Sequence, residues 1–96
     1  MTEYSNATLY ETMVYGPYGE CYIYSIFNEK FDTSSERFGI NIVLMVDGVT
    51  YQNKSGLLFG EYERAYDFLN FLKKHLVTPS NLPYIIEGLL DFASVG

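Results

Sequence analysis

The sequence predicts an α+β fold, in which a four-stranded antiparallel meander sheet is followed by two C-terminal helices packed on one of its faces. Two observations lead to this prediction. Up to about residue 53, runs of β-branched and aromatic residues are separated by turn signals, as in successive hairpins. From residue 61 onward, apolar residues recur at helical spacing. A chain of 96 residues, 48% of them hydrophobic, has room for one core, so we expect a single domain over residues 1–96.

The first predicted hairpin joins residues 7–15 to residues 20–28 through the turn signal Gly16-Pro17-Tyr18-Gly19. If all four turn residues lie in the loop, Tyr15 pairs with Glu20, and the strand period of two divides the hairpin into two faces. One face is polar and aromatic and suits solvent or a partner: Glu11, Tyr15, Glu20, Tyr22 and Tyr24. The other face is apolar and suits a core: Tyr10, Val14, Cys21, Ile23 and Phe27.

The second predicted hairpin follows from an alternation of apolar residues that stops at the turn dipeptide Asp47-Gly48. The alternating residues are Phe38, Ile40, Ile42, Leu44 and Val46. A two-residue turn pairs Val46 with Val49, so the apolar face continues onto a fourth strand over residues 49–53 and includes Tyr51. Residues 29–37 join the two hairpins and leave open whether the second strand is longer or bulged.

Two helices are expected after the sheet. Residues 61–77 form an amphipathic helix with glutamates at its start and basic residues at its end, as the helix dipole favours, and Thr78-Pro79 terminates it. Its apolar stripe comprises Tyr62, Ala65, Tyr66, Leu69, Leu72 and Leu76. The last helix has Asn81 as its expected N-cap and Pro83 in its first turn.

Charge and composition exclude several classes of partner. Six basic against twelve acidic residues give a net charge of −6, which opposes direct nucleic-acid binding, since that binding depends on Lys and Arg displacing counterions. No apolar run approaches the roughly 20 residues needed to span a bilayer, and we expect no membrane partner. The lone Cys21 cannot form an internal disulfide, and the first ten residues do not resemble a signal peptide, so we expect a cytoplasmic protein.

No catalytic, metal or cofactor site is predicted. His75 is the only histidine, and catalysis would need a nucleophile such as Cys21 and a carboxylate such as Asp67 within its reach, which the spacing does not provide. The His, Cys and carboxylate positions show no ligand spacing for zinc or calcium. The glycines form no nucleotide-binding motif. We therefore expect no enzymatic activity and no cofactor.

Tyrosines make the first hairpin the candidate binding surface. Six of the ten tyrosines precede residue 25, and four glutamates precede Lys30, the first basic residue. Tyrosine is enriched at protein interfaces, and neighbouring glutamates would steer a basic partner. The predicted contact residues are Glu11, Tyr15, Tyr18, Glu20, Tyr22 and Tyr24. Tyrosine is also a good strand former, so ordinary half-buried strand residues are the alternative interpretation.

Two segments in the last 40 residues, 67–72 (DFLNFL) and 77–87 (VTPSNLPYIIE), resemble a short domain family of unknown function found in clostridia and related Firmicutes. In that family a helix ends in a Val-Ser/Thr-Pro turn and is followed by an Ile/Val-Ile-Glu helix. Phe38-Gly39-Ile40 is similar to the start of a strand that precedes them. The resemblance implies an intracellular α+β domain and no known activity.

The expected function is non-enzymatic: a small acidic module that binds a protein partner with a basic surface. It is similar in kind to phage or mobile-element inhibitors such as anti-CRISPR proteins, which block a basic nucleic-acid-binding groove. The alternative is a cellular structural or regulatory module that forms a homodimer, through the tyrosine face or through Phe68 and Phe71. A small-molecule binder is a third class, but it lacks convergent polar groups.

Overall fold

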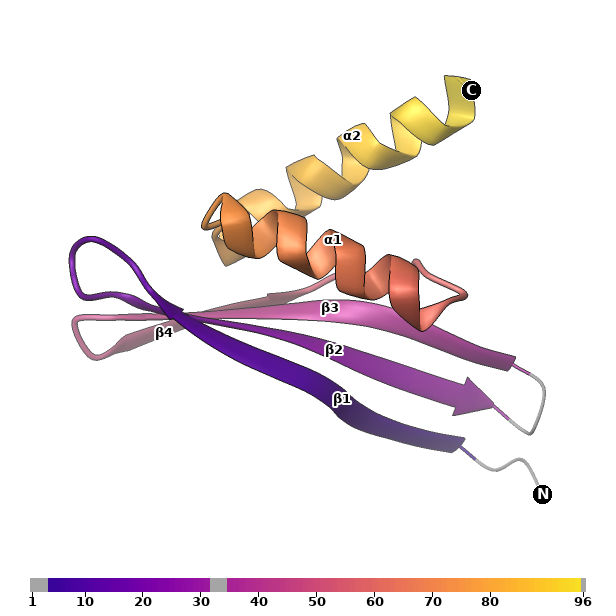
Figure 1. The fold of residues 1–96 in the computed structure, drawn as a ribbon, viewed down its shortest axis with the longest axis horizontal. Coiled ribbons are helices and arrows are strands. Elements are labelled where there is room, and N and C mark those ends of the chain that lie inside the picture. The colour runs from indigo at the N-terminus through magenta and orange to yellow at the C-terminus, as the bar shows by residue number, and fades with distance from the viewer. Residues whose placement is uncertain (1–3, 32–34, 96) are drawn as a thin grey trace.

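The computed structural model of the protein describes residues 4–31 and 35–95, with side chains described over 7–30 and 36–88. Within these ranges the elements follow the predicted order. They are β1 (Tyr4–Tyr15), β2 (Cys21–Phe31), β3 (Ser35–Val46), β4 (Val49–Lys54), α1 (Tyr62–Lys74), the 3₁₀ turn η1 (Pro79–Asn81) and α2 (Leu82–Val95). The strands form one antiparallel sheet in the order β1-β2-β3-β4, and both helices lie on the same side of it (Figure 1). The predicted α+β fold is confirmed.

The hairpin of β3 and β4 has the predicted register. Asp47 and Gly48 have φ angles of 51° and 76°, as a two-residue type I′ turn requires, and Val46 pairs with Val49. The segment that joins the hairpins is mostly strand, because β2 continues to Phe31 and β3 begins at Ser35. Residues 32–34 lie outside the described part of the chain.

The hairpin of β1 and β2 differs from the prediction by one residue. Its loop has three residues, not four: the Gly16 N–H donates to the Glu20 carbonyl oxygen at 2.8 Å, and Gly19 has a φ of 82°. A turn followed by a left-handed glycine is the usual three-residue hairpin loop. Tyr15 therefore pairs with Cys21 rather than with Glu20. Because side chains alternate along a strand, this shift exchanges the two faces of β2 relative to β1.

The core lies between the sheet and α1, and it contains the two tyrosines that we expected on the surface. Tyr24 is fully buried, Tyr22 nearly so, and their rings lie parallel with centroids 6.2 Å apart. The other buried core residues are Ile26, Phe38, Ile40, Ile42, Ala65, Leu69, Leu72, Val77 and Leu82. Tyr51, which we expected in the core, is 51% exposed, because β4 is an edge strand and α1 packs over β2 and β3.

The turn after α1 connects the helical layer to the sheet. The helix ends at Lys74, earlier than predicted, because Leu76 adopts a φ of 47°. The Leu76 N–H donates to the Lys73 carbonyl and the Val77 N–H to the Leu72 carbonyl, which is the Schellman pattern of helix termination. The Val77 carbonyl then accepts a 3.0 Å hydrogen bond from the hydroxyl of Tyr24.

The second helix begins over the sheet and then rises away from it (Figure 1). Its first residue, Leu82, is fully buried in the core. Asn81, the expected N-cap, stands at that position, one residue before the helix begins, and it is also the last residue of η1. Neither of the described helices is long and apolar enough to cross a membrane.

Candidate functional site

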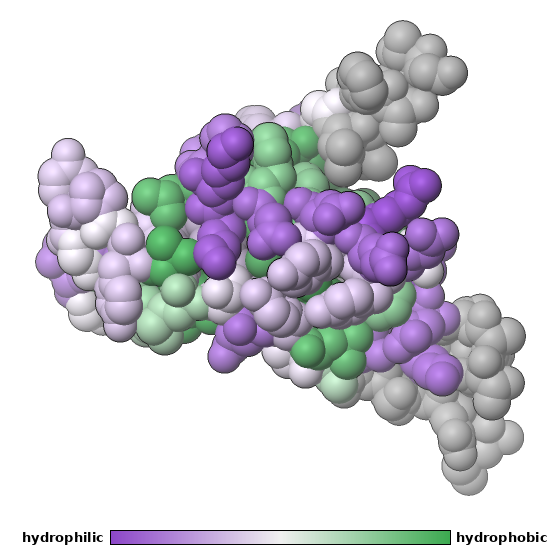
Figure 2. Space-filling model, in the orientation of Figure 1, coloured by the Kyte–Doolittle hydropathy of each residue, from purple (hydrophilic) through white to green (hydrophobic). Residues whose placement is uncertain are grey.

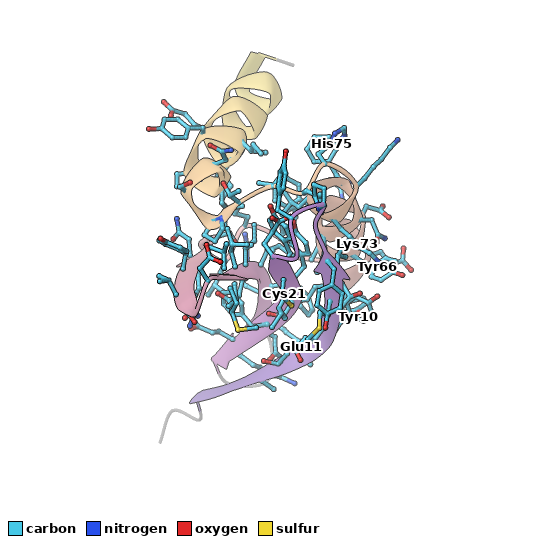
Figure 3. The ribbon with its side chains drawn as sticks, turned by 90° about the vertical axis from the view of Figure 1, so that its left-hand side faces the viewer. Tyr10, Glu11, Cys21, Tyr66, Lys73 and His75 are labelled. Atoms are coloured by element: carbon cyan, nitrogen blue, oxygen red, sulfur yellow. The ribbon has the colours of Figure 1, made fainter. Side chains whose placement is uncertain are left out.

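The two faces of the sheet have different neighbours. α1 packs on one face, and no element in the described ranges covers the other, which we call the open face (Figure 1). In Figure 3, Tyr10 lies beside Tyr66 of α1, with ring centroids 5.3 Å apart, whereas Glu11, the next residue along β1, lies on the other side of the sheet. The strand register therefore defines which side chains the open face presents.

Two adjacent cross-strand rows give the open face an apolar centre. In the first row Met13, Ile23 and Val43 stand opposite one another, and Gln52 continues the row on β4. In the second row Tyr15, Cys21 and Met45 are paired, and Thr50 continues it. The six apolar residues of these rows form what we call the apolar patch: Met13, Tyr15, Cys21, Ile23, Val43 and Met45.

The apolar patch is accessible. Tyr15 is 70% exposed, Met13 52% and Met45 38%, while Ile23 and Val43 between them are half-buried and Cys21 is buried. Antiparallel sheets with one solvated face usually present polar residues on that face. A contiguous group of apolar side chains there is instead typical of an interaction surface.

A polar row borders the apolar patch. It comprises Glu11, Ser25, Asn41 and Lys54, one residue from each strand. The Gln52 side-chain amide donates to the Asn41 side-chain oxygen at 3.1 Å. Glu11 stands at the outer end of this row on β1 and is exposed, and Lys54 stands at the opposite end on β4. The open face thus has an apolar centre with one acidic and one basic group beside it, on opposite edges of the sheet.

Beyond the polar row lies a hollow of about 600 Å³, lined in part by Phe27, Glu29, Lys54 and Gly56. The Lys54 ammonium lies 5.5 Å from the centre of the Phe27 ring, a cation–π contact. That ring lies directly over Gly39, where a Cβ would come within 2.5 Å of the ring and 2.9 Å of the Gly56 carbonyl oxygen. Glycine at position 39 is therefore required by the close approach of the ring.

The predicted contact residues divide into two groups. Glu11 and Tyr15 are exposed on the open face, and Tyr18 at the tip of the hairpin is 90% exposed. The other three, Glu20, Tyr22 and Tyr24, are buried, so their predicted place on a binding surface is wrong. For Tyr22 and Tyr24 the reason is the three-residue loop, which places the even-numbered residues of β2 on the face that α1 covers.

Glu20 has a structural place in the hairpin turn. Its carboxylate accepts a 3.3 Å hydrogen bond from the Tyr18 N–H and lies over Gly16, where it fills the position that a Cβ would occupy. Burial is the main cause that raises the pKa of the Tyr22 hydroxyl, and the neighbouring Glu20 raises it further. Burial, with a smaller contribution from Tyr22, raises the pKa of the Tyr24 hydroxyl well above its usual range.

Sequence reasoning missed most of the apolar patch. Ile23 and Cys21 were expected on the core side, and Val43 and Met45 were passed over because they alternate with the predicted core residues. Two signals pointed to them. Residues 42–46 (IVLMV) are apolar without interruption, which is typical of a strand with two apolar faces. Pro17 followed by Gly19 also suits a three-residue loop.

Cys21 and His75, which were considered for catalysis, lie on opposite sides of the sheet. Cys21 belongs to the open face, whereas His75 stands at the end of α1 on the other side of the sheet (Figure 3). The His75 ring packs against Phe71, with centroids 4.7 Å apart. Among the residues described, no three His, Cys, Asp or Glu side chains form a group that could hold a metal ion.

Comparisons with protein-family models, with curated proteins and with solved structures found no match to this chain. The resemblance to a clostridial family and the analogy with anti-CRISPR inhibitors therefore stay predictions.

Proposed function

We propose that this protein is a non-catalytic binding module that docks another protein on its open face, through the apolar patch. The observation that supports this proposal is the patch itself: two in-register rows of apolar side chains on a sheet face that the described elements leave uncovered. This proposal keeps the predicted class of function and moves the contact surface from the tyrosines to the apolar patch.

The composition of the patch suits protein recognition. Methionine is flexible and polarisable, so Met13 and Met45 can adapt to a partner surface. Tyr15 offers a large rigid ring that loses little entropy on binding. Fully burying a side chain of this size stabilises a complex by roughly 1.5–3 kcal/mol, whereas association itself costs roughly 4–15 kcal/mol. We therefore expect moderate affinity and easy dissociation.

The narrower hypothesis of an inhibitor that occupies a nucleic-acid groove has less support from the geometry. It depended on tyrosines and glutamates sharing one exposed face, and Glu20, Tyr22 and Tyr24 are buried. Hydrophilic side chains gather instead over the outer surface of α1 (Figure 2), where Glu63, Asp67 and other charged residues are exposed. We propose protein binding and leave the inhibitor hypothesis as a prediction.

The test is affinity capture with quantified recovery. Met13→Ser with Met45→Ser removes the most exposed methionines of the patch, and Tyr84→Ser, on the exposed part of α2, serves as the matched control. We expect a defined protein, either a cellular protein or tagged second copies of the chain, to be recovered with the wild type and the control but at least tenfold less with the patch variant. Equal recovery by all three baits, with unchanged circular dichroism, would contradict the proposal.

A further inference from the structure

We infer that the protein bound on the open face is a second copy of this chain, packed face to face with its strands aligned. This inference rests on the proposed function and names the partner of that same surface. It follows from three properties of the open face: its charge balance, the placement of its charges on opposite edges, and its apolar centre.

The charge of the open face is balanced, unlike that of the chain. The net charge of −6 favours a basic partner only if acidic residues gather on the contact surface. Among the residues that the structure describes, the strand register places two acidic and two basic side chains on the open face: Glu11, Glu29, Arg37 and Lys54. A balanced face does not select a basic partner, but it can complement itself.

A two-fold axis parallel to the strands makes the face complementary to its own copy. This rotation keeps each cross-strand row at its own level and exchanges the edges of the sheet, so that β1 lies over β4 of the second copy and β2 over β3. Glu11 of each copy then faces Lys54 of the other, because both residues belong to the polar row. The operation brings these two opposite charges together twice.

The same rotation places apolar residues of the two central strands against apolar residues, and it places Met13 and Tyr15 of β1 over Gln52 and Thr50 of β4. On the two central strands, Ile23 lies over Val43 of the second copy, and Cys21 lies over Met45. Sheets pack about 10 Å apart and within about 30° of alignment, a separation that side chains from both sheets fill. The pair has an apolar centre and charged edges, which is the usual anatomy of a protein interface.

The other two-fold arrangement is unfavourable. An axis perpendicular to the strands, centred on the row of Met13, would exchange the row of Tyr15 with the polar row. Glu11 would then lie against Tyr15 of the second copy and Lys54 against Thr50, so neither charge would meet an opposite charge, and burial of an unpaired charge is costly. The order of the rows therefore favours the arrangement in which the two-fold axis runs parallel to the strands.

The expected dimer is weak. Four strands about 4.8 Å apart and three rows about 6.8 Å apart cover a footprint of roughly 20 by 20 Å, smaller than a standard interface of about 800 Å² per partner. We therefore expect a monomer–dimer equilibrium that shifts over the micromolar to millimolar concentration range. The equilibrium should be visible by sedimentation velocity in a concentration series.

Charge reversal tests the arrangement. Glu11→Lys and Lys54→Glu each create like-charge contacts in the pair, so each should weaken dimerisation at least fivefold. The double variant Glu11→Lys/Lys54→Glu restores opposite charges and should return the dissociation constant to within about twofold of the wild type. Glu63→Lys and Lys74→Glu, exposed on α1, make the same charge changes away from the open face and should have no such effect. Thermal unfolding of each variant checks that the monomer is intact.

Val43→Glu provides a second test that does not depend on the edge charges. A carboxylate at the centre of the patch should abolish the dimer. A wild-type chain that stays monomeric at millimolar concentration would overturn this inference, while the proposed function would still stand if the Met13/Met45 variant lost a captured cellular protein. A dimer that tolerates Val43→Glu and both charge reversals uses another surface, and this result would overturn the inference.

Discussion

The two faces of the sheet are both apolar at their centres, yet only one is a core. On the covered face Tyr24, Ile40 and Ile42 are fully buried beneath α1, whereas on the open face Met13 and Tyr15 are more than half exposed. The residue types differ little between the faces. The difference shows that burial in this protein depends on what covers a side chain, and that hydrophobicity alone does not identify the core.

The central strand β3 is apolar on both of its faces. In β3, Ile42 and Leu44 face α1, whereas Val43 and Met45, which alternate with them, face outward. Strands that are apolar on both faces are usually covered on both. This supports our proposal that another chain covers the open face. Three experiments test whether the two faces differ in how much they stabilise the fold.

The largest expected effect comes from removing one tyrosine from each face. Tyr24→Ala should lower the free energy of unfolding by about 3–5 kcal/mol, because it leaves a cavity beneath α1 and an unpaired Val77 carbonyl. Tyr15→Ala should change it by no more than about 0.5 kcal/mol, because that side chain is already exposed. Urea unfolding at low protein concentration measures both. Similar losses for the two variants would mean that the faces are not distinct.

An intermediate effect is expected at Gly39. A methyl group there would meet the Phe27 ring and the Gly56 carbonyl oxygen, so Gly39→Ala should lower the free energy of unfolding by about 1–3 kcal/mol. Gly60→Ala, where a Cβ meets nothing within 4 Å, is the matched control and should be nearly neutral.

The double variant Phe27→Ala/Gly39→Ala separates the two contacts. The double variant lacks the ring but keeps the clash with the carbonyl oxygen. In the Phe27→Ala background, Gly39→Ala should therefore lower the free energy of unfolding by less than it does in the wild type. Strict additivity of the two substitutions would show that the ring does not pack on Gly39.

The smallest effect is the alkaline dependence of stability. Burial raises the pKa of Tyr24 above the ordinary value of 10.0, so above that pH the unfolded chain releases the proton first. Below pH 10 the protonated Tyr24 makes its full contribution to the free energy of unfolding. As the pH rises further, this contribution falls by up to about 1.4 kcal/mol per pH unit. Urea unfolding between pH 8 and pH 11 should give a shallower decline for Tyr24→Phe than for the wild type.

The fold was more predictable than the candidate site. The strand order, the β3–β4 register and α1 followed from local patterns, such as the Asp47-Gly48 turn and the helical spacing after residue 61. The site was only partly found: Glu11, Tyr15 and Tyr18 are exposed as expected, but Tyr22 and Tyr24 are not. One miscounted loop residue caused this error, because a register shift of one moves every side chain of a strand to the other face.

Local patterns in the sequence set the kinds of element and their order, since turn residues, alternation and helical spacing all act between residues that are close in the chain. Tertiary structure decided which face became the core. The four-residue and three-residue loops are both compatible with the glycines and Pro17, and the three-residue loop places Tyr24 beneath α1, where its hydroxyl reaches the Val77 carbonyl 53 positions later. Burial under a distant helix thus selected the register, and the same choice left the apolar patch exposed.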